Sequence, residues 1–172
     1  FIDRLSDTNL RTFDELYTDG GILSNDPAPI GAAIARGKTR MFGSDPSDGS
    51  VVRHTQPFVD GDAVAWPPAL FTRIAPPAGD VTAISSLDDR VITWTERAIY
   101  AFSGDGPAED GTTDNGGFSK PQIVPGDVGC TDPASIVLTP NGHIFKTAKG
   151  IYILGTDFSL RYVGAPVERF NA

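Results

Sequence analysis

The sequence predicts an all-β fold of antiparallel four-stranded units, which correspond to about two to three blades of a partial β-propeller. Three observations predict it. Glycine (19) and proline (14) are abundant among the 172 residues, which favours turns over long helices. Short runs of β-branched and aromatic residues alternate with tight turns, above all from Val81 onward. Finally, residues 83–104 repeat the pattern of residues 135–156.

The composition is that of a folded, acidic protein. Hydrophobic residues make up 40% and charged residues 21%, so a core can form. The net charge of −8 predicts a surface that repels nucleic acid. Cys130 is the one cysteine, which rules out an internal disulfide and fits a reducing compartment. No signal peptide is visible, and no apolar run approaches the roughly 18 residues of a membrane span.

We expect one domain over residues 1–172, and its first part, 1–80, to hold irregular blades and loops. Residues 6–21 favour an extended run over a short helix, because Thr, Phe and Tyr prefer strands. Proline then punctuates a loop at 22–31. The runs that follow are two strand-like pieces joined at 36–38, a strand at 51–55, and a mostly irregular stretch at 56–80. Since the chain opens at Phe1 without a methionine, we expect a piece of a longer protein.

Residues 81–130 predict one blade. Strands are expected at Val81–Leu87, 91–95 and 98–104, and the links between them are too short for anything but hairpins. A polar, glycine-rich loop follows, and 121–126 would supply a fourth, outer strand.

Residues 131–172 predict a second blade with the same order of elements. Its strands are expected at 134–139, 143–147, 151–156, 158–164 and 166–170. An ungapped overlay with an offset of 52 residues matches the turn Asp88-Asp89 with Pro140-Asn141 and gives five identities. The apolar positions of this repeat form its expected structural core: Ile84, Ile92, Trp94, Ile99, Tyr100, Ile136, Ile144, Ile151 and Tyr152.

A repeat of about 40–50 residues with four strands is typical of a propeller blade, whose inner strands are buried on both faces. The runs around Tyr100 and Tyr152 are continuously apolar, as such strands should be. The alternative is two unrelated meanders in a β-sandwich. A third copy would lie near residues 30–55, with Arg40–Asp45 standing over Tyr152–Asp157.

Motifs for catalysis are absent from the sequence. Gly31–Thr39 nearly spells a phosphate-binding loop, but the required first glycine falls on Ala32, so we interpret it as a basic hairpin turn. His54 and His143 lie within strand-like runs and have no zinc-ligand spacing. No nucleophile elbow is present, and Cys130 is expected to be buried. We therefore expect no enzymatic activity and no cofactor.

Two weaker patterns concern ligands. Carboxylates share the loop 105–114, which could hold calcium, although the spacing misses the known twelve-residue pattern and a solvated acidic loop is the simpler interpretation. The residues are Asp105, Glu109, Asp110 and Asp114. Asp45 and Asp48 are expected to form a turn. Trp66 and Trp94 could stack on sugar rings, but Trp94 lies mid-strand and is expected to pack between blades.

Three stretches of the sequence resemble a known family. "LYTDGGILSNDPAPI", "VTAISSLDDRVITWTERAIYAFSGDGP" and "GCTDPASIVLTPNGHIFKTAKGIYILGTDFSLRYVGAPVE" are similar to blade sequences of the phage virion proteins that form the β-propeller nozzle of short tails. The resemblance covers about two thirds of the chain and is strongest over 81–168. Its motifs mark turns and inner strands and identify no catalytic site. The chain is much shorter than a complete nozzle subunit.

The resemblance implies a structural role in the virion. Such a protein would self-associate in a ring around the DNA exit channel and contact other tail proteins. DNA would pass transiently without specific binding, and no membrane would be involved. The alternative is a carbohydrate-binding propeller that recognises a receptor, which would need exposed aromatic residues at equivalent places on each blade. A propeller hydrolase or oxidoreductase is a third alternative, without a supporting constellation.

Overall fold

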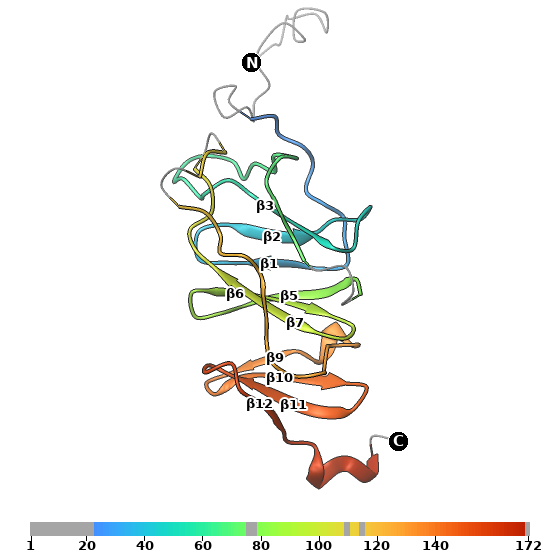
Figure 1. Cartoon of the computed structure of the whole chain (residues 1–172). Coiled ribbons are helices and arrows are strands. Elements are labelled where there is room, and N and C mark those ends of the chain that lie inside the picture. Colours follow the sequence, from blue (N-terminus) through green and yellow to red (C-terminus); the bar gives the residue numbers. More distant parts are fainter. Residues whose placement is uncertain (1–22, 75–78, 109–110, 114–115, 171–172) are drawn as a thin grey trace, which may run out of the picture.

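Three antiparallel four-stranded sheets make up the fold, which confirms the all-β class. They are seen in a computed structural model that describes residues 23–74, 79–108, 111–113 and 116–170. In every sheet, strands that are neighbours in sequence are also neighbours in space. The sheets are stacked along the molecule in chain order, with sheet 2 between sheets 1 and 3 (Figure 1).

Sheet 1 lies within the segment that the sequence predicted as irregular. Its strands are β1 (Ile34–Arg36), β2 (Met41–Ser44), β3 (Val51–His54) and β4 (Phe71–Arg73). The third strand continues into a long connection, 55–70, before the chain returns as β4, a strand that the sequence did not predict. Trp66 from this connection covers the outer side of β2, where a Cβ at Gly43 would lie 3.4 Å from the indole.

Sheet 2 follows the predicted plan closely. Its strands are β5 (Val81–Leu87), β6 (Arg90–Thr95), β7 (Ile99–Ser103) and β8 (Gln122–Ile123). The short β8 pairs with β7 at the outer edge, as expected for the fourth strand. Leu87 pairs with Arg90, so β5 and β6 are joined by the two residues Asp88 and Asp89. Asp88 has a φ of 52°, the positive sign that favoured two-residue hairpin loops require.

Sheet 3 repeats this arrangement with two differences from the prediction. Its strands are β9 (Val137–Thr139), β10 (Gly142–Thr147), β11 (Gly150–Gly155) and β12 (Leu160–Tyr162). The first strand starts late because Pro133–Ser135 form a 3-10 turn, η2, in which the Asp132 side chain accepts a hydrogen bond from the amide of Ala134. The expected fifth strand at 166–170 is wrong, since Ala165–Phe170 form a 3-10 helix, η3. None of the helices that the structure describes could cross a membrane.

The repeat found in the sequence is also a repeat of hydrogen-bond register. Leu87 pairs with Arg90, and Thr139, 52 residues later, pairs with Gly142. Arg90 likewise pairs with Ser103, and Gly142 pairs with Gly155. The predicted alignment of a third copy, Arg40–Asp45 with Tyr152–Asp157, is wrong by one strand. Arg40–Asp45 contains β2, the second strand of sheet 1, whereas Tyr152 lies on β11, the third strand of sheet 3.

Candidate functional site

The seam between sheets 2 and 3 is built around Trp94. Side chains of successive strand residues point to opposite faces. Ile92, Trp94 and Ile99 therefore share one face of sheet 2, and all three are completely buried. From sheet 3, Phe145 approaches the Trp94 ring with centroids 4.6 Å apart and His143 approaches it edge-on at 5.7 Å. The indole nitrogen donates to Ser85 Oγ at 2.7 Å. Trp94 packs between two sheets, as predicted.

The seam between sheets 1 and 2 uses the opposite face of sheet 2. Tyr100 and Phe102 lie there, together with Ile84 and Val91, against Phe42 and Val52 of sheet 1. Three aromatic rings surround the ring of Phe118. Its centroid lies 4.9 Å from that of His54, 5.6 Å from that of Phe42 and 5.4 Å from that of Phe102. Sheet 2 is thus buried on both faces, which explains its continuously apolar strands.

Equivalent residues of sheets 2 and 3 face the same way along the stack. In sheet 2, Tyr100 and Phe102 face the preceding sheet, and their counterparts 52 residues later, Tyr152 and Leu154, also pack toward the preceding sheet. We call this the N-side face of a sheet and the opposite one the C-side face. Ile136 packs on the N-side as Ile84 does. The sheets therefore stack head to tail.

The C-side face of sheet 3 holds the remaining positions of the predicted core. Ile144 and Ile151 are half-buried there, and they correspond to the completely buried Ile92 and Ile99 of sheet 2. Lys146 stands where sheet 2 has Trp94, and it is exposed. Among the described residues no further sheet lies against this face.

Arg40 is a buried cation that joins sheet 1 to the loop after β7. Its side chain is 1% exposed, and its Nε donates to the carbonyl oxygen of Asp105 at 2.9 Å. One terminal nitrogen donates to the Thr55 carbonyl at 2.9 Å and the other to the Pro107 carbonyl. Burial lowers the pKa of this guanidinium, while the nearby Asp105 carboxylate opposes the shift. Three carbonyls satisfy a charge that would otherwise be costly to bury.

Both histidines are buried and neutral. Burial lowers the pKa of His54 to about 4, the hydrogen bond from His54 Nδ1 to the Thr55 carbonyl opposes this, and the positive charge of Arg40 adds to the lowering. Burial also lowers the pKa of His143. Within the described part of the chain, His143 Nδ1 has no hydrogen-bond partner. Both imidazoles therefore lie in the packed interior of the protein.

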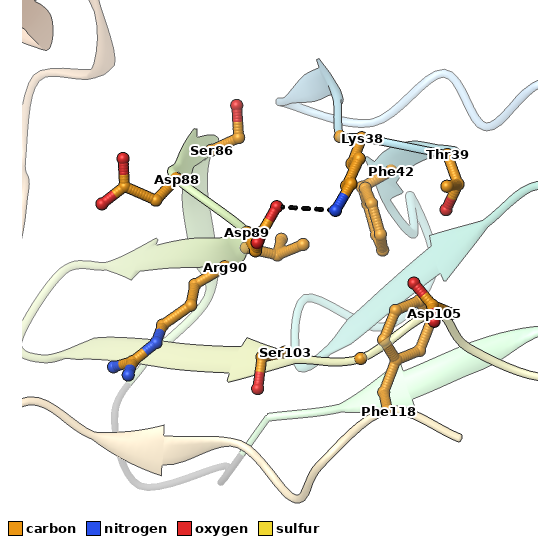
Figure 2. A pocket seen from close by; sticks show the side chains of 13 residues that line it. Lys38, Thr39, Phe42, Ser86, Asp88, Asp89, Arg90, Ser103, Asp105 and Phe118 are labelled. Atoms are coloured by element: carbon orange, nitrogen blue, oxygen red, sulfur yellow. Dashed lines mark ion pairs between the residues drawn. The ribbon is translucent and has the colours of Figure 1, made fainter. Parts of the chain in front are cut away.

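A pocket of about 290 Å³ opens at the end of the seam between sheets 1 and 2 (Figure 2). Three turns that are distant in sequence surround it: 37–39, 88–89 and 103–105. Lys38 Nζ lies 3.0 Å from the Asp89 carboxylate and bridges the two sheets across the mouth. Phe42, Val91 and Phe118 form the apolar part of the wall.

A second cavity, of about 360 Å³, lies where the first strands of the three sheets converge. Residues of β1, β5 and β9 border it, among them Ala35, Ala83 and Leu138. The fourth strands β4, β8 and β12 lie at the other edges of their sheets. The first strands carry few charges: Arg36 is the one charged residue among β1, β5 and β9.

The sequence favoured a solvated acidic loop over a calcium site, and packing over sugar stacking for Trp94; only the second of these can be compared with the described residues. Of the acidic loop, Glu109, Asp110 and Asp114 lie outside the described residues, and the described part of the chain holds no group of three potential metal ligands. Trp66 is 5% exposed and Trp94 is fully buried, so neither offers a ring to a sugar. Asp45 accepts from the amides of Ser47 and Asp48, which confirms the turn.

Cys130 and the near-match to a phosphate-binding loop have structural roles. Cys130 is buried, its thiol donates to the Asp132 carbonyl at 3.2 Å, and burial raises its pKa. Gly31–Thr39 covers β1 and its turn into β2, so the strand and helix that a phosphate site needs are not formed around it. Neither the hydrogen bonds from Arg40 to three backbone carbonyls nor the pocket was predicted, because no sequence pattern links residues 40, 89 and 105.

Comparison with protein-family models and with the curated proteins found no match to this chain.

Proposed function

We propose that the three sheets are successive blades of a β-propeller and that the protein is a structural component of a phage virion. The head-to-tail stacking of the sheets carries this proposal, since a blade contacts each neighbour through a different face. Sheet 2 provides the pattern: its N-side face packs on sheet 1 and its C-side face on sheet 3. The convergence of β1, β5 and β9 on one cavity supports it further, because the first strands of blades surround a common axis.

A two-sheet sandwich fits these observations less well. In a sandwich each sheet buries one face and leaves the other solvated. Here Val91–Thr95 of β6 are all buried, because both faces of sheet 2 are covered. The C-side face of sheet 3 also fits a propeller. Its Ile144 and Ile151 correspond to Ile92 and Ile99, which sheet 3 covers in sheet 2, so a further blade would cover them in the same way.

The place in the virion that we propose is a nozzle-like ring around the DNA exit channel. The resemblance over residues 81–168 supports it, as does the net charge of −8. A channel through which a polyanion slides must not bind its phosphates, and an acidic surface repels them at short range. The ring would form by self-association and would contact other tail proteins, with neither catalysis nor a cofactor involved.

The proposal is tested by electron microscopy of the purified full-length protein, together with fractionation of phage tails by sedimentation. We expect ring-shaped particles and the protein in the tail fraction. As a control, the same preparation in a chaotropic salt should dissociate the rings into subunits. A stable monomer that is missing from tail particles would contradict the proposal.

A further inference from the structure

We propose that the pocket between the turns of sheets 1 and 2 binds a neutral, hydroxyl-rich ring, the size of one monosaccharide. This function goes beyond the structural role proposed above and does not depend on it. The pocket volume of about 290 Å³ lies just below the range of about 300–1,000 Å³ that is usual for ligand sites. A single sugar ring is therefore a suitable size.

The charges at the mouth select against charged ligands. Lys38 and Arg90 contribute cations, and Asp88, Asp89 and Asp105 contribute carboxylates. Lys38 lies between Asp89 and Asp105, whereas the side chains of Asp88 and Arg90 point away from it (Figure 2). The hydrogen bond to Asp89 and the charge of that carboxylate raise the pKa of Lys38, and the more distant Asp105 adds to the rise, so the ammonium group stays charged. An anion entering the pocket would meet the aspartates, and a cation would meet Lys38, so a ligand without net charge is favoured.

Free polar groups line the same space. The hydroxyls of Thr39, Ser86 and Ser103 make no hydrogen bond to any residue that the structure describes. They can donate and accept, whereas a carboxylate only accepts and an ammonium only donates. Hydroxyl groups on a ligand match this mixed set, because each can act in both roles.

The inner wall provides the apolar contact that a sugar ring also needs. Phe42, Val91 and Phe118 line the pocket on the side of the seam. Phe118 is fixed by the rings of His54, Phe42 and Phe102 around it. The Asp105 backbone is fixed by its hydrogen bond from Arg40, so this wall is held in place before a ligand arrives.

The experiment titrates the 172-residue chain with a panel of neutral sugars, namely glucose, galactose, mannose, rhamnose and N-acetylglucosamine, with glucuronate as a charged comparison. Binding is followed by backbone amide NMR shifts. We expect at least one neutral sugar to bind with a Kd near 1 mM and to shift the amides of Lys38, Asp89, Ser103 and Asp105. Glucuronate should bind more weakly than glucose by about tenfold, the effect of one misplaced charge.

Matched variants locate the site. Asp89→Ala and Asp105→Ala should each weaken sugar binding about tenfold, which is the loss of one charge-assisted hydrogen bond. Asp127→Ala is the control, because Asp127 also pairs with an exposed lysine, Lys149, at 2.7 Å and lies outside this pocket. Binding in the control should be unchanged. Absence of shifts with every sugar, or equal binding by all three variants and the wild type, would overturn the proposal.

Discussion

At the scale of single residues, Arg40 determines how the loop after β7 is attached to sheet 1. The guanidinium spans the Asp105, Pro107 and Thr55 carbonyls and contacts the Phe118 ring at 5.9 Å. A salt bridge is not needed here, since carbonyl oxygens in a fixed arrangement satisfy all three bonded nitrogens. The sequence placed Arg40 only at the start of the expected third repeat copy, Arg40–Asp45, because burial of a charge cannot be seen in a pattern.

Replacing Arg40 with methionine should lower the free energy of unfolding by about 3 kcal/mol, because buried carbonyls lose charged donors. Urea denaturation measures the loss. Arg90→Met is the matched control: Arg90 is exposed and stacks on Phe158 at 4.3 Å, so its loss should cost below about 1 kcal/mol. Equal losses of unfolding free energy in Arg40→Met and Arg90→Met would contradict this role of Arg40.

His54 makes stability depend on pH. Its pKa is about 4 in the folded protein and about 6.5 when unfolded, so the unfolded chain binds more protons between these values. Stability should be unaffected by this residue above pH 6.5 and should fall as the pH drops toward 4, by at most about 3 kcal/mol. Urea denaturation from pH 7 to 4.5 measures this, and His54→Phe should show a shallower fall than the wild type. Parallel curves would contradict it.

Trp94 should contribute more than any other single side chain to the seam between sheets 2 and 3. Trp94→Ala leaves a cavity against Phe145 and should cost about 3–5 kcal/mol of unfolding free energy. Ser85→Ala, which removes only the acceptor of the indole hydrogen bond, should cost about 1 kcal/mol. A thermal or urea unfolding curve measures both. A cost below about 1 kcal/mol for Trp94→Ala would mean that the two sheets do not pack through it.

At the scale of elements, the turn between β5 and β6 stores backbone strain. Asp88 has a φ of 52°, a left-handed conformation that costs a residue with a Cβ about 1–2 kcal/mol. Asp88→Gly should therefore stabilise the protein by about 0.5–1 kcal/mol, and Asp88→Val should destabilise it. Asp89→Gly is the control, because Asp89 has no positive φ and pairs with Lys38. A stabilising Asp89→Gly would show that the effect is not due to φ.

The elements that could be predicted are those fixed by local geometry. Links of two and three residues forced β5, β6 and β7 into hairpins, and the fourth strand at Gln122–Ile123 followed from the same plan. β4 was missed because a long connection separates it from β3, so its pairing depends on tertiary contacts. η3 was mistaken for a strand because Val167 and Phe170 suit either structure.

At the scale of the whole molecule, stacking was predictable and the pocket was not. A repeat of 52 residues in register implies that the C-side face of one sheet meets the N-side face of the next, and this inference needs only the sequence. The pocket depends on the packing of sheet 1 on sheet 2, which brings residues 37–39 beside residues 88–89. The sequence carries no pattern for the pocket, because its three turns come together only after both sheets have formed and packed.

The central claim is that sheets 2 and 3 stack face to face and do not pair edge to edge in one sheet. Nuclear Overhauser contacts from the Trp94 indole protons test this most directly. We predict strong contacts to the Phe145 and His143 rings, 4.6 and 5.7 Å away between centroids, and none to Phe42 of sheet 1. Trp94 contacts to Phe42, or backbone contacts that join β8 to β12, would contradict the account.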